Sequence, residues 1–117
     1  MVVALLAGAC TTQPRQTAEA PPAYVIAEIV VTDPTGYRDY LTAISPIVEK
    51  FGGTYWVRAG RTLQVEGAEP NGRIVVISFP SFAAAEAFQN APESLAAGEI
   101  RHRAATSRIF VVEGASP

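Results

Sequence analysis

Residues 24–31, YVIAEIVV, constrain the fold more than any other stretch, because they are apolar on both faces of the strand they are expected to form. Their β-branched residues predict a β-strand. Side chains of a strand alternate between its two faces, which here carry Tyr24, Ile26 and Val30 on one side and Val25, Ala27, Ile29 and Val31 on the other. Two later stretches, residues 73–79 and 108–113, have the same character. Strands of this kind are buried on both sides.

Helical patterns separate these strands. Apolar residues recur at three- and four-residue spacing from Tyr37 to Phe51, which predicts a helix that begins at Asp33-Pro34 and ends at Gly52-Gly53. Pro46 is expected to kink this helix or divide it.

The rest of the chain continues the alternation. A second strand is expected from Thr54 to Ala59, continuing past Gly60 to Glu66. A second helix is expected to follow the capping residue Ser81, to break at Pro92 and to resume over residues 93–104.

The resulting order is β-α-β-β-α-β, which predicts an α+β, ferredoxin-like fold with a four-stranded antiparallel sheet and helices on one face. Helices on one face leave the other face of an apolar sheet in water, as a patch larger than monomers usually expose. A second copy of the sheet is the simplest cover, since two-fold pairing is the commonest symmetry. We therefore expect a homodimer with the sheets face to face.

Composition excludes several classes of protein. The 117 residues carry a net charge of −2 and include no run of Lys or Arg, so nucleic acid is not an expected partner. One cysteine and one histidine exclude an internal disulfide and a zinc site with Cys and His ligands, and we expect no metal and no cofactor. No apolar stretch approaches the ~20 residues that span a bilayer.

The N-terminus is interpreted as a targeting signal rather than as part of the folded domain. Residues 1–10 end in LLAGAC and resemble the remnant of a bacterial lipoprotein signal, with Cys10 as the lipidated residue. Residues 11–23 contain three prolines and predict a flexible linker, followed by the folded domain over 24–114 and a tail over 115–117. This predicts a lipoprotein of the cell envelope or periplasm, with membrane contact only through the lipid. The alternative is a cytoplasmic chain with an incidental cysteine.

Several stretches together resemble one known family. AYVIAEIVVTDPTGYRDYL, GGTYWVRAG and RIVVISFPSFAAAEAF are similar to the domain-of-unknown-function 1330 family over residues 23–114. The resemblance implies the fold and dimer of the dimeric α/β-barrel superfamily, and it implies no activity. The chain departs from the family at Ala59, where a glycine is usual, and at Gln89 and Ser94, where aromatic residues are frequent. If those aromatic residues line a pocket, the pocket of this chain is altered.

Glu28 is the outstanding polar residue, a carboxylate inside an apolar strand that needs a partner or a wet cavity. Arg58 could supply that partner if both side chains point into the space between subunits. A carboxylate in an enclosed pocket is a candidate general acid or base. The alternative is a structural ion pair, or a carboxylate at the solvent-exposed mouth of the barrel.

Further candidates are His102 for acid–base chemistry and Trp56, Arg58 and Tyr37 for binding a ligand. Each also has a structural interpretation: His102 as a solvated residue near a helix C-terminus, and the aromatic residues as core or interface packing. Trp56 and Tyr55 alternate along a strand, so they are expected on opposite faces.

Two functions remain open at this level. One is a small cofactor-independent enzyme or small-molecule-binding dimer; the other is a non-catalytic binding module of the cell envelope. The sequence does not decide whether the protein is an enzyme.

Overall fold

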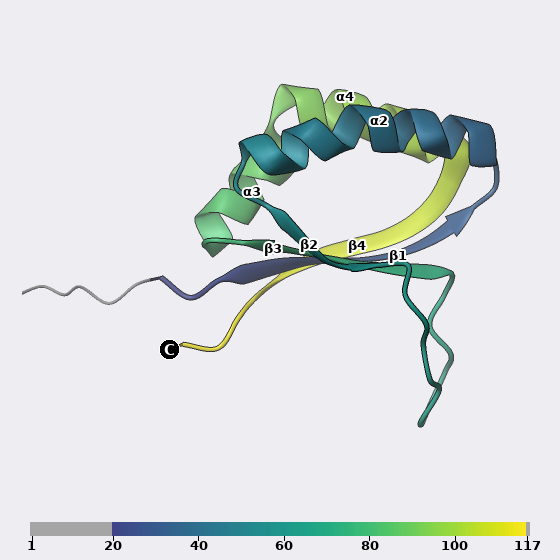
Figure 1. The fold of residues 1–117 in the computed structure, drawn as a ribbon, viewed down its shortest axis with the longest axis horizontal. Coiled ribbons are helices and arrows are strands. Elements are labelled where there is room, and N and C mark those ends of the chain that lie inside the picture. Colours follow the sequence, from purple (N-terminus) through teal and green to yellow (C-terminus); the bar gives the residue numbers. More distant parts are fainter. Residues whose placement is uncertain (1–19, 117) are drawn as a thin grey trace, which may run out of the picture.

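The sheet is antiparallel, with strand order β2-β3-β1-β4, and all helices lie on one of its faces (Figure 1). The computed structural model describes residues 20–116. Its elements are β1 (Ala23–Val31), α2 (Pro34–Lys50), β2 (Thr54–Arg58), β3 (Arg73–Phe79), α3 (Phe82–Asn90), α4 (Pro92–Ala104) and β4 (Ala105–Glu113). The ferredoxin-like prediction is confirmed.

β1 lies in the middle of the sheet, which explains why it is apolar throughout. It pairs with β3 from Ala23↔Phe79 to Ile29↔Arg73, and with β4 from Ala23↔Glu113 to Val31↔Ala105. A strand hydrogen-bonded on both edges and covered on its faces has little contact with water.

The helices follow the predicted boundaries with one exception. α2 continues through Pro46 as a single helix of 17 residues, so the expected division is wrong. Pro46 and Thr42 are both exposed, so the carbonyl that loses its partner at this proline can bind water. The predicted cap at Ser81 is confirmed: its Oγ accepts a hydrogen bond from the Ala84 amide at 3.0 Å.

β2 ends at Arg58, and the expected continuation to Glu66 is wrong. The backbone leaves the strand at Ala59, whose φ of 60° lies in the left-handed region. Residues 59–72 form an exposed loop that extends away from the helices, beyond the other face of the sheet (Figure 1). Leu63 and Val65 in this loop are 85% and 82% exposed.

The core lies between the sheet and the helices. Phe79 and Val48 are its largest fully buried side chains, and the Phe88 ring lies 5.0 Å from that of Phe79. Within residues 20–116, no helix is long and apolar enough to cross a membrane.

The sheet face without helices is apolar, and we call it the open face. It carries Tyr24, Ile26, Glu28, Val30, Trp56, Val57, Ile74, Val76, Arg108, Phe110 and Val112. Trp56 is 62% exposed although its ring packs at 5.1 Å from that of Tyr24. Phe110 and Val112 are exposed as well.

Candidate functional site

A partly enclosed cavity of about 50 Å³ lies between the sheet and the helices. Its apolar wall comes from the inward side chains of β1 and β3, which are Val25, Ala27, Ile29, Val75 and Ile77. Leu41, Ile44, Phe88 and Ile109 extend this wall. Three tyrosines and three arginines also enter the cavity from α2, α4 and the sheet, which is unusual for a protein core.

Three arginine–tyrosine pairs build this polar lining. The guanidinium carbon of each arginine lies close to the centre of one tyrosine ring: Arg58 at 4.2 Å from Tyr55, Arg73 at 5.0 Å from Tyr37, and Arg101 at 5.3 Å from Tyr40. Cations over aromatic faces are attracted by the ring quadrupole. Stacking therefore orders three cations around one small space.

A β-bulge in β2 places the Arg58 side chain at the cavity. Tyr55 pairs with Ile77 and Val57 pairs with Val76, so one extra residue, Trp56, is inserted in β2. Without the insertion Trp56 and Arg58 would share a face, since side chains alternate. The bulge shifts the alternation by one, so Trp56 packs on the open face and Arg58 lines the cavity.

Arg58 stands at the edge of the cavity. It is exposed, and its Nη2 donates to the Ser45 hydroxyl at 3.4 Å. Together with Tyr55 it also borders a shallow depression at the start of β2. The two hollows therefore adjoin at Arg58.

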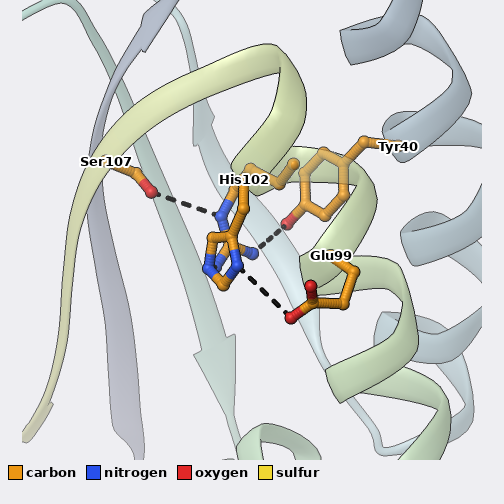
Figure 2. A network of polar contacts seen from close by, with 5 residues as sticks. Tyr40, Glu99, His102 and Ser107 are labelled. Atoms are coloured by element: carbon orange, nitrogen blue, oxygen red, sulfur yellow. Dashed lines mark hydrogen bonds and ion pairs between the residues drawn. The ribbon is translucent and has the colours of Figure 1, made fainter.

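Arg101 is held by a network that runs from the cavity to the surface (Figure 2). Its Nε donates to Ser107 Oγ at 3.2 Å and its Nη1 to the Tyr40 hydroxyl at 3.3 Å. His102 Nε2 lies 3.4 Å from Arg101 Nη2, and its Nδ1 lies 3.5 Å from Glu99 Oε2. If His102 carries its proton on Nδ1, that nitrogen donates to Glu99 and Nε2 accepts from Arg101.

Two buried polar atoms of the lining have no hydrogen-bond partner among the described residues: Arg73 Nε and Ser94 Oγ. Ser94 is 8% exposed and enters from α4. Gln89 and Ser94, where the sequence departs from its family resemblance, both line the cavity. Short polar side chains at these positions leave space that larger rings would fill.

The buried phenols of the site keep their protons. Burial raises the pKa of Tyr37 above its ordinary value, with the nearby Arg73 charge opposing the shift. Burial also raises the pKa of Tyr55, against the hydrogen bond from Ser45 and the Arg58 charge. Both hydroxyls are therefore neutral near pH 7, where they can donate hydrogen bonds.

Glu28 lies outside this cavity, and it does not form the expected pair with Arg58. It faces Arg108 directly across the β1–β4 ladder, and Arg108 Nη1 lies 3.5 Å from Glu28 Oε1 on the open face. The bulge at Trp56 is the reason, because it turns Arg58 to the helix side of the sheet. Since the Arg108 side chain is 68% exposed, the pair adds at most about 1 kcal/mol to stability.

The other predicted residues are divided between two faces. Tyr37 lines the cavity beside Arg73. Trp56 lies on the open face, opposite to Tyr55 as the alternation predicts. His102 is exposed on α4 and reaches the cavity only through Arg101. Cys10 lies outside the described residues.

Sequence reasoning missed Arg73 and Arg101 as site residues. Arg73 begins an apolar strand and Arg101 lies in a basic helix end, so each has an ordinary explanation. The signal that could have found Arg73 is its position in the strand, because Arg73, Val75 and Ile77 alternate onto the face that the helices cover. Among residues 20–116, no group of three or more His, Cys, Asp or Glu could hold a metal ion.

Comparison with known proteins gives one family and several similar folds. The model of DUF1330, a domain of unknown function, matches residues 22–115. No curated protein matches the chain.

Three solved structures share the fold at low sequence identity. A protein of unknown function from Rhodopseudomonas palustris is 20% identical, with a TM-score of 0.67, over 86% of this chain and 87% of that one. SnoaB, a cofactor-independent oxygenase from Streptomyces nogalater, is 13% identical, with a TM-score of 0.60, over 84% and 97%. A dimeric ferredoxin-like protein of unknown function from Thermobifida fusca is 16% identical, with a TM-score of 0.51, over 86% and 100%.

Proposed function

This chain belongs to the DUF1330 family of unknown function, and from that premise and the cavity we propose that it is a homodimeric protein that binds a small molecule between its sheet and its helices. The observation that carries the proposal is the polar lining of the cavity. Ordinary cores are packed with apolar side chains and leave few voids. Here three ordered arginine–tyrosine pairs surround a space in which buried polar atoms lack protein partners.

Binding is favoured over catalysis by the placement of the titratable groups. Glu28 is on the open face and His102 is exposed, so neither borders the cavity. The lining offers neutral phenols, guanidinium groups and a serine hydroxyl, which bind and orient a ligand. Acid or base roles for Glu28 and His102 remain part of the enzymatic alternative.

That alternative is a small cofactor-independent enzyme, and one observation favours it. SnoaB, whose fold is similar, is described as a cofactor-independent oxygenase. In such an enzyme the substrate would occupy the same cavity, so binding is the step that both candidates share. Consumption of a bound ligand in the presence of oxygen, measured by mass spectrometry, separates the two.

The dimer is proposed from the open face. Four of its large apolar side chains are exposed: Trp56, Val57, Phe110 and Val112. The exposed fraction of each is 37% or more. A sheet-sized apolar face is larger than the patches that monomers usually expose. A second copy would bury it on both partners, and the similar Thermobifida fusca protein is described as dimeric. Loop 59–72, with Leu63 and Val65, extends past the same face toward such a partner (Figure 1).

A lipid anchor at Cys10 is proposed from the sequence alone. An apolar stretch, small residues, a cysteine and a proline-rich segment follow one another in the order of a lipoprotein signal. We expect the protein purified from host membranes to begin at a diacylated Cys10. An unmodified Met1 in the cytosolic fraction would favour the cytoplasmic alternative.

The binding function is tested with a library of very small fragments, each of a few heavy atoms, monitored by methyl NMR. We expect bound fragments to shift the methyl signals of Val25, Ala27 and Val75, which line the cavity. Ala27→Ile should abolish these shifts by filling the space, and Ala87→Ile, at an exposed site of α3 outside the cavity lining, is the matched control. Fragments that shift only open-face methyls would refute a ligand site under the helices.

A further inference from the structure

The cavity concentrates positive charge without a protein counter-ion. Its lining includes Arg58, Arg73 and Arg101 and no aspartate or glutamate. The ion pairs found among residues 20–116 are Lys50–Glu93, His102–Glu99 and Arg108–Glu28, so none neutralises these arginines. Guanidinium groups stay charged at any pH that proteins tolerate. Three unpaired cations around a partly buried space favour an anion inside it.

The hydrogen-bond donors of the lining agree with this charge. Arg73 Nε and Ser94 Oγ are buried and have no partner among the described residues. A buried donor without an acceptor is costly, and native structures contain few. The Tyr37 hydroxyl, whose pKa burial raises, adds a neutral donor beside Arg73. Water could satisfy these donors, but it does not neutralise the charge.

The size of the cavity limits the anion. An apolar protein cavity of about 150 Å³ admits benzene. The space here is about 50 Å³, which suits a ligand of a few heavy atoms rather than a ring.

The apolar wall selects among small anions. Val25, Ala27, Val75 and Ile77 form an apolar wall on the sheet. Arg58 and Arg73 enter beside it from β2 and β3, and Arg101 enters from α4. A methyl or methylene group packs favourably there, whereas inorganic phosphate is polar on all sides. An aliphatic carboxylate has both an apolar carbon end and an anionic end, and its planar carboxylate group matches the donors of a guanidinium group.

We propose that the cavity binds a compact aliphatic carboxylate of the size of acetate or glycolate, with Arg73 Nε and the neighbouring Tyr37 hydroxyl donating to its oxygens and its carbon end against β1 and β3. This proposal rests on the proposed binding function and specifies its ligand class. Arg58 adds a cation at the cavity edge, where Glu49 also lines the adjoining depression. Arg101, tied to Tyr40 and Ser107, supplies a fixed cation at the far side from β2.

The test is an NMR titration of the full chain with sodium acetate at constant ionic strength, observing arginine Nε–Hε and methyl signals. We expect acetate to shift Arg73 Nε–Hε with a Kd of the order of 0.1–1 mM, since few heavy atoms limit the affinity. Acetamide, the neutral isostere, should bind at least about 10-fold more weakly. Arg73→Gln should weaken acetate binding by about 10-fold or more, whereas Arg108→Gln on the open face should leave it unchanged.

Tyr37→Phe is a second, milder variant, which keeps the proposal testable if Arg73→Gln does not fold. We expect it to weaken acetate binding several-fold while open-face signals stay in place. Equal binding of acetamide and acetate would overturn the carboxylate and leave the binding function standing. Tighter binding of benzoate than of acetate would overturn the size limit of the ligand. Tighter binding of phosphate than of acetate would overturn the carboxylate as the ligand class. Absence of any shift with acetate, together with fragments that bind in the cavity, would overturn this inference alone.

Discussion

The two faces of the sheet are formed by the same strands through the same alternation of side chains, yet one face is buried and the other is exposed. The helix-covered face is buried and contains a cavity with an apolar wall and three arginines. The open face is in water and carries Tyr24, Trp56 and Phe110 around one ion pair, Glu28–Arg108. Polar groups lie where a core is expected, and apolar groups lie where a surface is expected.

This inversion separates two kinds of recognition. A buried polar space selects a small ligand by charge and hydrogen bonding, because the low dielectric strengthens each contact. An exposed apolar sheet binds another apolar surface by area. The bulge at Trp56 connects the two, since one extra residue sends Trp56 to the open face and Arg58 to the cavity.

The largest expected effect compares one phenylalanine from each face. Phe79 is 1% exposed and Phe110 is 40% exposed. Phe79→Ala should lower the free energy of unfolding by about 3–5 kcal/mol, because it leaves a cavity in the core. Phe110→Ala should cost about 1 kcal/mol or less in the separated monomer. Urea unfolding over a series of protein concentrations measures both; equal losses would contradict the difference between the faces.

The next effect concerns assembly. Phe110→Glu places a carboxylate twice in a symmetric apolar interface, where burial penalises the charge even beside Arg108, and should weaken self-association by about 100-fold or more. Analytical ultracentrifugation should then find monomers at concentrations where the parent chain is dimeric. Arg73→Gln, on the covered face, is the control and should leave the association constant unchanged. An undiminished dimer in Phe110→Glu would remove the open face as the interface.

The alkaline limb of stability tests the covered face. Burial raises the pKa of Tyr37 and of Tyr55 above 10.0 in the folded chain. The folded state therefore holds these protons more tightly than the unfolded state, so their stabilisation is complete below pH 10 and is lost as the pH rises through the raised values. Thermal unfolding against pH, followed by circular dichroism, should show a weaker alkaline loss in Tyr37→Phe/Tyr55→Phe. An unchanged alkaline limb would contradict the burial of these phenols.

The smallest effect concerns the end of β2. Ala59 has a φ of 60°, a conformation that costs alanine about 1 kcal/mol and glycine very little. Ala59→Gly should therefore raise the free energy of unfolding by up to about 1 kcal/mol, reduced by the greater entropy of glycine in the unfolded chain. Chemical unfolding measures it, and a clear loss of stability would contradict this account of the loop. Ala68→Gly, in the same exposed loop, is the control.

Much of the fold could be predicted because local signals and tertiary structure agree. The apolar strands, the Ser81 cap and the break at Pro92 each follow from a few neighbouring residues. The division of α2 at Pro46, one of the two outcomes expected there, and the continuation of β2 past Ala59 were wrong for the same reason. Pro46 and Ala59 occupy backbone positions whose outcome depends on packing and exposure, not on residue type alone.

The site was harder to predict than the fold. Simple alternation places Trp56 and Arg58 on one face, and only the bulge separates them. The partner of Glu28 was also not predicted. Arg108 lies 80 positions further along the chain and faces Glu28 only through the register of β1 and β4. Gln89 and Ser94 were marked by their departure from the family resemblance, and both border the cavity.

The central claim is that the covered face binds a small carboxylate and the open face binds a second copy. One methyl NMR spectrum, recorded against acetate and against protein dilution, tests both halves. We predict that acetate shifts the signals of Val25, Ala27 and Val75, and that dilution shifts those of Ile26, Val76 and Val112. Acetate shifts on the open-face methyls, or dilution shifts confined to the cavity, would contradict the division between the two faces.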